Sequence, residues 1–299
     1  MTIQVQFLMS SNPKNLLEAL TKTGLPTVTV EAEYGSDVVP GSIATLAHHG
    51  PRAGQACPCS YPNNFIRDVG KIGESDLEHI QLAGGLSHID LDTLGGCAAI
   101  LGCKPDVSGF WELAEFVDVN GEHKISQSGA TEENVRRYYA YAAWHEENKT
   151  FSNRDGSVSE VTTKVLEALK IIDRIAKDDP ELLKAGDEYK ANEAKLNAET
   201  FIESRDGVGL RVSSQFVNHL YVTPDGALLK AVVTYKPQVG GITISFADAP
   251  KGKNAIQILK ELFGEEAGGH AGIAGSPRGK RMSFVDFAAA YQSTIEAVK

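Results

Sequence analysis

One histidine and two aspartates stand at alternate positions in residues 87–96, a segment that ends in small residues. The segment follows residues 80–86, an apolar run broken by glycine, which is typical of a buried strand. Such a strand would deliver His88, Asp90 and Asp92 to its carboxyl end. Divalent cations bind carboxylate oxygens and accept imidazole nitrogen, so the three side chains could converge on one ion. The first hypothesis is therefore a metal site.

A structural role for the same aspartates is the alternative. A helix is expected to begin near Thr93, and Asp90 or Asp92 could cap it. Capping would account for one aspartate. It would not account for His88 together with the second aspartate.

The second informative segment, residues 268–279, is dense in glycine and also contains His270 and Arg278. Glycines let the backbone approach a ligand closely and leave amide N–H groups open to an anion. The planar guanidinium of arginine suits phosphate. The segment therefore predicts a phosphate or carboxylate clamp, and the alternative is a loop between a helix and a strand.

Together the two segments resemble the DHH phosphoesterase superfamily with its DHH-associated C-terminal domain. The resemblance rests on His-x-Asp-x-Asp followed by small residues and on a distant Gly-Gly-His-x-x-x-Ala-Gly, in an order that agrees with the family. The family includes single-strand exonucleases, oligoribonucleases, cyclic-dinucleotide phosphodiesterases and inorganic pyrophosphatases. The resemblance implies a metal-dependent phosphoesterase that hydrolyses a phosphodiester or phosphoanhydride bond of a small nucleotide or short oligonucleotide in an interdomain cleft. It also implies two manganese ions, with magnesium or zinc as alternatives.

The Asp-His-His triplet that names the family is absent from this chain. One stand-in is a strand-like approach over residues 116–123, which offers Asp118 and His123. The other is the pair His48 and His49 at the end of a predicted strand. Successive strand residues point to opposite faces, so only one of this pair can face a site unless the strand has already ended. Either segment, or both, could complete the metal site.

The candidate residues fall into three groups. Metal binding is expected of His48, His49, His88, Asp90, Asp92, Asp118 and His123. Catalysis is expected of Asp90, Asp92 and His123. Substrate binding is expected of Gly268, Gly269, His270, Gly275 and Arg278.

The cysteines leave a further alternative open. Four cysteines in 299 residues are too few for a disulfide framework. Cys57 and Cys59 favour a loop role, although with His48 and His49 they could surround zinc in a different class of hydrolase. A non-catalytic nucleotide- or phosphate-binding protein on the same fold is the other alternative, because the naming triplet is missing.

Composition limits the class of protein and partner. The net charge of −10 argues against a broad grip on duplex nucleic acid and favours a small phosphorylated substrate. The start of the chain lacks the pattern of a secretory signal, and no apolar run is long enough to cross a bilayer. We therefore expect a soluble, cytoplasmic protein without a membrane partner, and a homodimer is an open alternative for its assembly.

Elements that could position these residues alternate along the chain. Strands are expected at 26–30, 42–47 and 80–86, with helical segments between them, which predicts an α/β fold with a mainly parallel sheet and a site at the carboxyl ends of its strands. Helices are expected over 131–148 and 157–200, the latter divided at Pro180. Further strands are expected at 210–212, 216–222, 228–235 and 241–246, and helices at 254–263 and 284–298.

This order predicts two domains joined by helices. We expect a metal-binding catalytic domain over residues 1–158, a helical linker over 159–205 and a smaller C-terminal α/β domain for substrate binding over 206–299.

Overall fold

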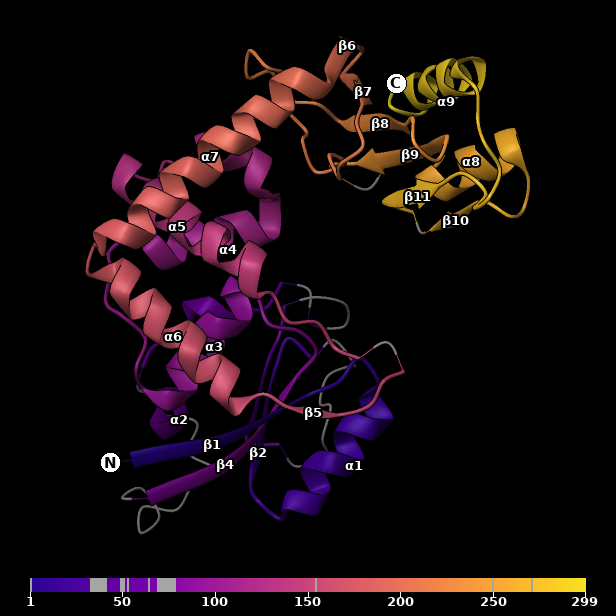
Figure 1. Ribbon diagram of the computed structural model, residues 1–299. Helices are drawn as coiled ribbons and strands as arrows, with labels where there is room; N and C mark the ends of the chain where they lie inside the picture. Colours follow the sequence, from indigo (N-terminus) through magenta and orange to yellow (C-terminus); the bar gives the residue numbers. More distant parts are fainter. Residues whose placement is uncertain are drawn as a thin grey trace. The chain divides into compact units, whose positions relative to one another are not determined.

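The computed structural model is a mixed α/β protein, which confirms the predicted fold class (Figure 1). It describes residues 2–32, 42–48, 52, 54–63, 65–68, 79–153, 155–248, 250–269 and 271–299. The chain forms two compact units: the first contains residues 1–120 and 127–189, and the second contains 121–126 and 190–299.

A five-stranded sheet in the order β3-β2-β4-β1-β5 forms the centre of the first unit. The strands are β1 (Thr2–Met9), β2 (Thr27–Val30), β3 (Ala44–Leu46), β4 (His79–Leu86) and β5 (Ser159–Glu160). All neighbours are parallel except β5, which runs antiparallel to β1. The predicted parallel sheet is therefore confirmed, and the carboxyl ends of β2, β3 and β4 lie on one edge.

Strand β1 was not predicted, although it pairs with β4 along its whole length. Its side chains alternate between the two faces of the sheet. Phe7 belongs to the larger core of the unit, and the next residue, Leu8, belongs to a smaller cluster with Leu16 and Leu20.

Helices cover both faces of this sheet. They are α1 (Pro13–Thr23), α2 (Phe65–Asp68), α3 (Leu91–Leu101), α4 (Phe110–Asn120), α5 (Glu132–Asn148) and α6 (Thr162–Ala176), with a short 3-10 helix η2 (Pro58–Ser60). Figure 1 shows α1 on one face and α3 and α6 on the other. The long helix α7 (Pro180–Thr200) begins at Pro180, as expected, and the chain passes from the first unit to the second within it.

Helix α4 corrects the expected strand-like approach to Asp118. The alternation of Val117 and Val119 around Asp118 indicated a strand, but these residues form the last turns of a helix. The longer pattern explains the helix, because Phe110, Leu113, Ala114 and Val117 follow the spacing of one helical face.

Helix α3 packs unusually close to its neighbours because it contains two glycines. A Cβ atom on Gly95 would lie 2.4 Å from Cβ of Cys59, and one on Gly96 would lie 2.7 Å from Cγ1 of Val30. The missing side chains therefore allow the start of α3 to approach both Cys59 and the end of β2.

The second unit contains a six-stranded sheet in the order β10-β11-β9-β8-β7-β6. The strands are β6 (Phe201–Arg205), β7 (Val208–Val212), β8 (Ala231–Lys236), β9 (Gly241–Phe246), β10 (Gly268–Gly269) and β11 (Ile273–Gly275). Among these neighbours only β7 and β8 are parallel. Helices α8 (Ala255–Phe263) and α9 (Phe284–Ala297) pack into the core of this sheet, and the 3-10 helix η4 (Glu122–Gln127) lies mostly in the same unit.

The strand expected at residues 216–222 is wrong. The segment forms turns, apart from one bridge between Val222 and Leu228. Backbone carbonyls of Leu220 and Val222 accept hydrogen bonds from the buried Arg211 guanidinium, at 3.0 and 2.7 Å. Because Arg211 already donates to these carbonyl oxygens, they do not need the N–H groups of a neighbouring strand as partners.

No helix in the described ranges is both long and apolar enough to cross a membrane.

Candidate metal centre

Four ionisable side chains meet at the carboxyl edge of the first sheet: Glu31, His48, Asp92 and Asp118. Glu31 directly follows β2, and His48 follows β3 after one intervening residue. Asp92 lies in the first turn of α3, which begins shortly after β4, and Asp118 lies in the last turn of α4. Elements distant in sequence thus contribute one residue each.

His48 lies at the middle of this group. Its Nε2 atom is 2.7 Å from Oδ2 of Asp118, 3.6 Å from Oδ2 of Asp92 and 3.8 Å from Oε1 of Glu31. One ligand atom each from Glu31, His48 and Asp92 can be chosen within 4.8 Å of one another. This spacing permits the three atoms to contact a single cation.

Three of the four side chains are buried, and that of Asp118 is 20% exposed. Glu31 is 1%, Asp92 2% and His48 9% exposed. Carboxylates are almost never this buried unless they are paired or bind a metal, because ionised groups lose their hydration. An aspartate and a glutamate buried beside one imidazole therefore favour an additional cation.

The two oxygens of Asp92 have different surroundings. Oδ1 accepts a hydrogen bond from the backbone N–H of Cys59 at 2.9 Å. Oδ2, on the side of His48, has no hydrogen-bond partner among the residues that the structure describes. The first contact orients the carboxylate, and the second oxygen remains directed at the centre.

Glu31 has a backbone conformation that is uncommon outside glycine, with φ of 48°. Its N–H donates to the carbonyl of Leu46 at 2.8 Å, and its carbonyl accepts from the hydroxyl of Ser87. These contacts hold the strained residue between two strand ends. Strain of this kind clusters at functional sites.

Burial and mutual repulsion alter the acidity of the two carboxyl groups. Burial, followed by the charges of Asp92, Asp90 and Asp118, raises the pKa of Glu31 to about 8. Burial also raises the pKa of Asp92 to about 7, although its hydrogen bonds to Cys59 act in the opposite direction. Both groups would ionise more readily beside a positive ion.

Cys57 places a sulfur atom beside the imidazole of His48. Its Sγ lies 3.2 Å from Nδ1 and 3.8 Å from Nε2 of His48. His48, Cys57 and Asp118 form a second set of ligand atoms within 4.8 Å of one another. Cys59 differs, because its thiol contacts the carbonyl of Trp111 at 3.8 Å.

The structure separates His88 and Asp90 from Asp92. Nε2 of His88 lies 3.0 Å from Oδ2 of Asp90, and both side chains are 36% exposed. Asp90 caps α3 by accepting from the N–H of Thr93 at 2.9 Å, so the capping alternative is confirmed for this aspartate. Burial acts to raise the pKa of Asp90, but the hydrogen bond and charge of His88 and the N–H of Thr93 hold it below its usual range.

His123 belongs to the second unit, in η4. Its ring packs edge to face on Tyr221, with 5.1 Å between the ring centroids. Burial lowers its pKa, and its Nε2 has no hydrogen-bond partner among the described residues.

The glycine-rich segment forms a small hairpin from β10 and β11. Gly269 has φ of 138°, and a Cβ there would lie 2.5 Å from Cα of Ala274. Hairpin packing thus accounts for Gly269, whereas Gly268 has open space beside it. Arg278 is exposed, and the predicted residues His49 and His270 lie outside the described residues.

Glu31 was missed by the sequence analysis, and Cys57 was assigned mainly to a loop. The available signal for Glu31 was its place directly after the predicted strand 26–30, the same rule that pointed to His48 and Asp92.

Comparison with known proteins assigns no family. No model of a protein family matches the chain, and no curated protein matches it. One solved structure, an uncharacterized protein from Helicobacter pylori G27, is 12% identical over 99% of both chains, with a TM-score of 0.21. A similarity of this size assigns neither fold nor function.

Proposed function

We propose that the chain is a metal-dependent phosphoesterase that hydrolyses a phosphodiester or phosphoanhydride bond of a small nucleotide or short oligonucleotide. One observation carries the proposal: Glu31, Asp92 and Asp118 surround His48 at the carboxyl edge of a parallel sheet. Ligands bind at this edge in open α/β sheets. A carboxylate-rich set with one imidazole suits a hard or borderline divalent cation.

The residues present fit such an ion, and these four side chains would hold it. When bound, a divalent ion supplies a more acidic water and stabilises charge on phosphoryl oxygens. The contact between Cys59 N–H and Asp92 keeps one carboxylate oxygen directed at the centre, and the short contact with Asp118 orients the imidazole of His48.

The His88–Asp90 pair offers a separate role. It is half-exposed, and it lies near enough to Glu31 for both of its charges to affect the pKa of that residue. We assign His88 the delivery of a proton to the leaving oxygen, with Asp90 orienting its ring. A histidine held by a carboxylate at the rim of a buried site suits general acid catalysis.

The cofactor proposal is manganese, with two ions, and it rests on the family resemblance; magnesium is the alternative for an oxygen-rich ligand set. Substrate phosphate is assigned to the hairpin of Gly268, Gly269 and Gly275 and to Arg278. The chain's charge of −10 favours a short substrate over a polymer, because repulsion grows with the number of phosphates.

A hydrolysis screen tests the proposal. Manganese-loaded protein is incubated with pyrophosphate, linear dinucleotides, cyclic dinucleotides and phosphomonoesters, and the Asp92→Asn variant is tested in parallel. We expect turnover of at least one phosphodiester or phosphoanhydride that the variant has lost. Metal binding without turnover would instead identify a non-catalytic binding protein.

Cys57 favours a second candidate, a zinc-dependent hydrolase. Its sulfur lies 3.8 Å from Nε2 of His48, which is compatible with two neighbouring ligands of one zinc ion. Cobalt(II) distinguishes the candidates, because a thiolate ligand adds a sulfur-to-metal charge-transfer band. Loss of that band in Cys57→Ser, and not in the control Cys103→Ser, would support zinc. Cobalt d–d absorption without the band would support the oxygen-rich centre.

A further inference from the structure

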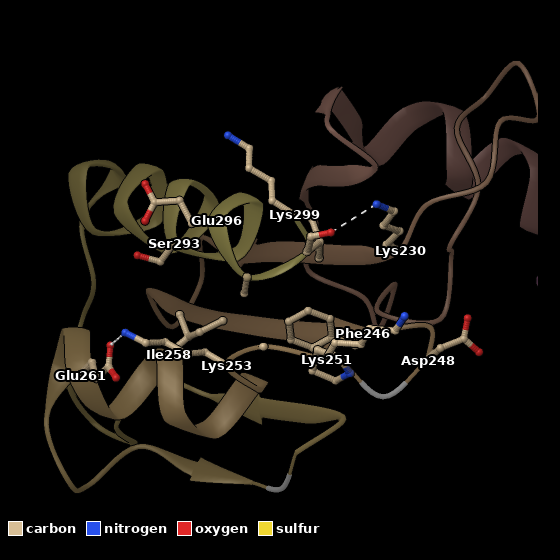
Figure 2. Close-up of a pocket in the computed structure, with 14 residues that line it drawn as sticks. Lys230, Phe246, Asp248, Lys251, Lys253, Ile258, Glu261, Ser293, Glu296 and Lys299 are labelled. Carbon is tan, nitrogen blue, oxygen red and sulfur yellow. Dashed lines mark hydrogen bonds and ion pairs between the residues drawn. The ribbon is translucent and has the colours of Figure 1, made fainter.

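A large cavity lies within the second unit, outside the residues assigned to the metal centre or to the hairpin. Its volume is about 780 Å³, and it lies between the end of α9 and the segment that leads into α8 (Figure 2). Pockets of ~300–1,000 Å³ are typical of small-molecule sites. The cavity is therefore large enough for a molecule of the size of a mononucleotide.

Close backbone packing forms one wall of this cavity. A Cβ atom on Gly252 would lie 3.0 Å from the carbonyl oxygen of Ala297, so the segment before α8 packs against the end of α9 at this point. Helix α8 starts with a capping box between Asn254 and Gln257, which fixes where this segment ends.

The interior of the cavity is partly apolar. Phe246 ends β9, Ile258 belongs to α8, and Val298 follows α9. In Figure 2 the side chains of Phe246 and Ile258 lie between α9 and the segment that carries Lys251 and Lys253. This surface suits the apolar face of an organic ligand.

Cations gather around the same cavity. Four lysines and three carboxylate residues line it: Lys230, Lys251, Lys253, Lys299, Asp248, Glu261 and Glu296.

Two of these carboxylates already have lysine partners. Glu261 pairs with Lys253 at 2.6 Å, and Asp248 pairs with Lys124, which is not a lining residue, at 3.0 Å. Of the other lysines, Lys251 makes no hydrogen bond or ion pair with any residue in the described ranges. Lys299 lies 4.0 Å from Asp206, which is outside the lining. The side chains of the lining carry a formal excess of one positive charge, in a chain whose net charge is −10.

Lys230 is held close to the cavity. Its Nζ donates to the carbonyl oxygen of Val298 at 3.2 Å, which leaves two of its three ammonium donors for another acceptor. Lys230 directly precedes β8 and Lys251 lies in the segment before α8, so the two lysines come from different parts of the unit.

From this arrangement we infer that the cavity is a second ligand site, which binds a small organic phosphate. The phosphate contacts Lys230 and Lys251, and the planar or aliphatic body lies on Phe246 and Val298. Lysine binds phosphate as a mobile point charge, and the apolar surface adds affinity that free phosphate cannot gain. The inference is independent of the proposed hydrolysis, because the cavity residues differ from those of the metal centre and from the hairpin and Arg278.

Calorimetry on the full chain tests this site. The titrations use chelator and low salt, so that ligand binding does not depend on metal and charge is weakly screened. The probes are adenosine monophosphate, inorganic phosphate and adenosine. We expect adenosine monophosphate to bind more tightly than inorganic phosphate or adenosine alone. Equal affinity for adenosine monophosphate and inorganic phosphate would overturn the role of the apolar surface.

Two exposed lysines provide the matched variants. Lys251→Glu should raise the Kd of adenosine monophosphate roughly tenfold, because one charged contact is lost and a repulsive one replaces it. Lys280→Glu, in the same unit but outside the cavity lining, makes the same change in net charge and should leave the Kd within about twofold. Equal effects of the two variants would overturn the site.

A third variant tests the apolar surface. Val298→Trp should fill part of the cavity, and we expect it to weaken adenosine monophosphate and adenosine while inorganic phosphate binds as before. Far-ultraviolet circular dichroism confirms that each variant is folded. Absence of binding of adenosine monophosphate to the wild-type chain at millimolar concentration would refute the inference.

Discussion

The carboxylate of Asp118 lies 2.7 Å from Nε2 of His48, and this contact connects the last turn of α4 to the segment after β3. Cys57 lies beside the same ring, with its Sγ 3.2 Å from Nδ1 and 3.8 Å from Nε2. The imidazole therefore has a carboxylate and a thiol as close neighbours. Its orientation depends on α4 as well as on the sheet.

Asp92→Asn should abolish metal-dependent hydrolysis and lower metal affinity by more than about 100-fold, beyond the loss typical of an outer contact. The asparagine oxygen can still accept from the N–H of Cys59, so the fold should persist. Elemental analysis after dialysis measures bound metal, and Asp173→Asn, at an exposed helical position, is the control. Unchanged metal content would remove Asp92 from the centre.

The metal-free protein should lose stability as the pH rises from about 4.5 to about 8. Glu31 has its ordinary pKa of 4.5 in the unfolded chain and a pKa of about 8 in the folded one. Over this interval Glu31 is ionised in the unfolded chain but still protonated in the folded one. The free energy of unfolding therefore decreases by on the order of a few kcal/mol. Glu31→Gln should reduce the slope, and the raised pKa of Asp92 should leave the remainder.

Urea denaturation at several pH values in chelator measures this effect. Glu181→Gln, whose side chain is 89% exposed in the wild type, is the matched control and should keep the wild-type slope. Added metal should stabilise the protein more at high pH, because it binds the ionised carboxylates. If Glu31→Gln retained the full slope, another group would be responsible.

Gly95→Ala should destabilise the first unit by about 1–3 kcal/mol. The new methyl group would lie 2.6 Å from Cα of Cys59, and backbone cannot move aside as a flexible side chain would. Because the N–H of Cys59 orients Asp92, metal affinity should also fall. Thermal unfolding and metal titration measure both effects; Gly241→Ala, with its nearest neighbour at 3.4 Å, should be nearly neutral.

Arg278→Ala should raise KM roughly tenfold with little change in kcat, since it removes a contact to substrate phosphate and leaves the metal ligands intact. Arg278 is exposed and makes no hydrogen bond or ion pair with the described residues, so stability should not change. Steady-state kinetics on the substrate found by the screen measures KM and kcat for Arg278→Ala, with Lys195→Ala as the control. An unaltered KM would exclude the clamp.

The edge of the sheet that carries the site could be predicted from the sequence, because the strands at 26–30, 42–47 and 80–86 are apolar runs followed by polar residues. His48 and Asp92 were named on this ground. Strand β1 was missed, although the alternation of its glutamines with apolar residues is itself a strand pattern. Pairing with β4 on one side and β5 on the other identifies it.

The partners of His48 could not be predicted in the same way. Asp118 reaches it from a helix that was expected to be a strand, and Glu31 is a single acidic residue with no local motif. The proximity of these residues to His48 depends on tertiary packing. The same is true of Asp90 and Asp92, which are two positions apart in the sequence: Asp92 accepts from the N–H of Cys59, whereas Asp90 contacts His88. The spacing of these residues in the sequence does not show which partners their side chains contact.

The anchoring of Asp92 by the N–H of Cys59 determines how an ion would be selected. A carboxylate already fixed through one oxygen loses little rotational freedom when the other oxygen is ligated, so ordering it at binding has a small entropic cost. It also cannot swing far to follow a larger or smaller cation. A cation bound here would therefore meet a carboxylate of fixed position, and its radius would have to match that position.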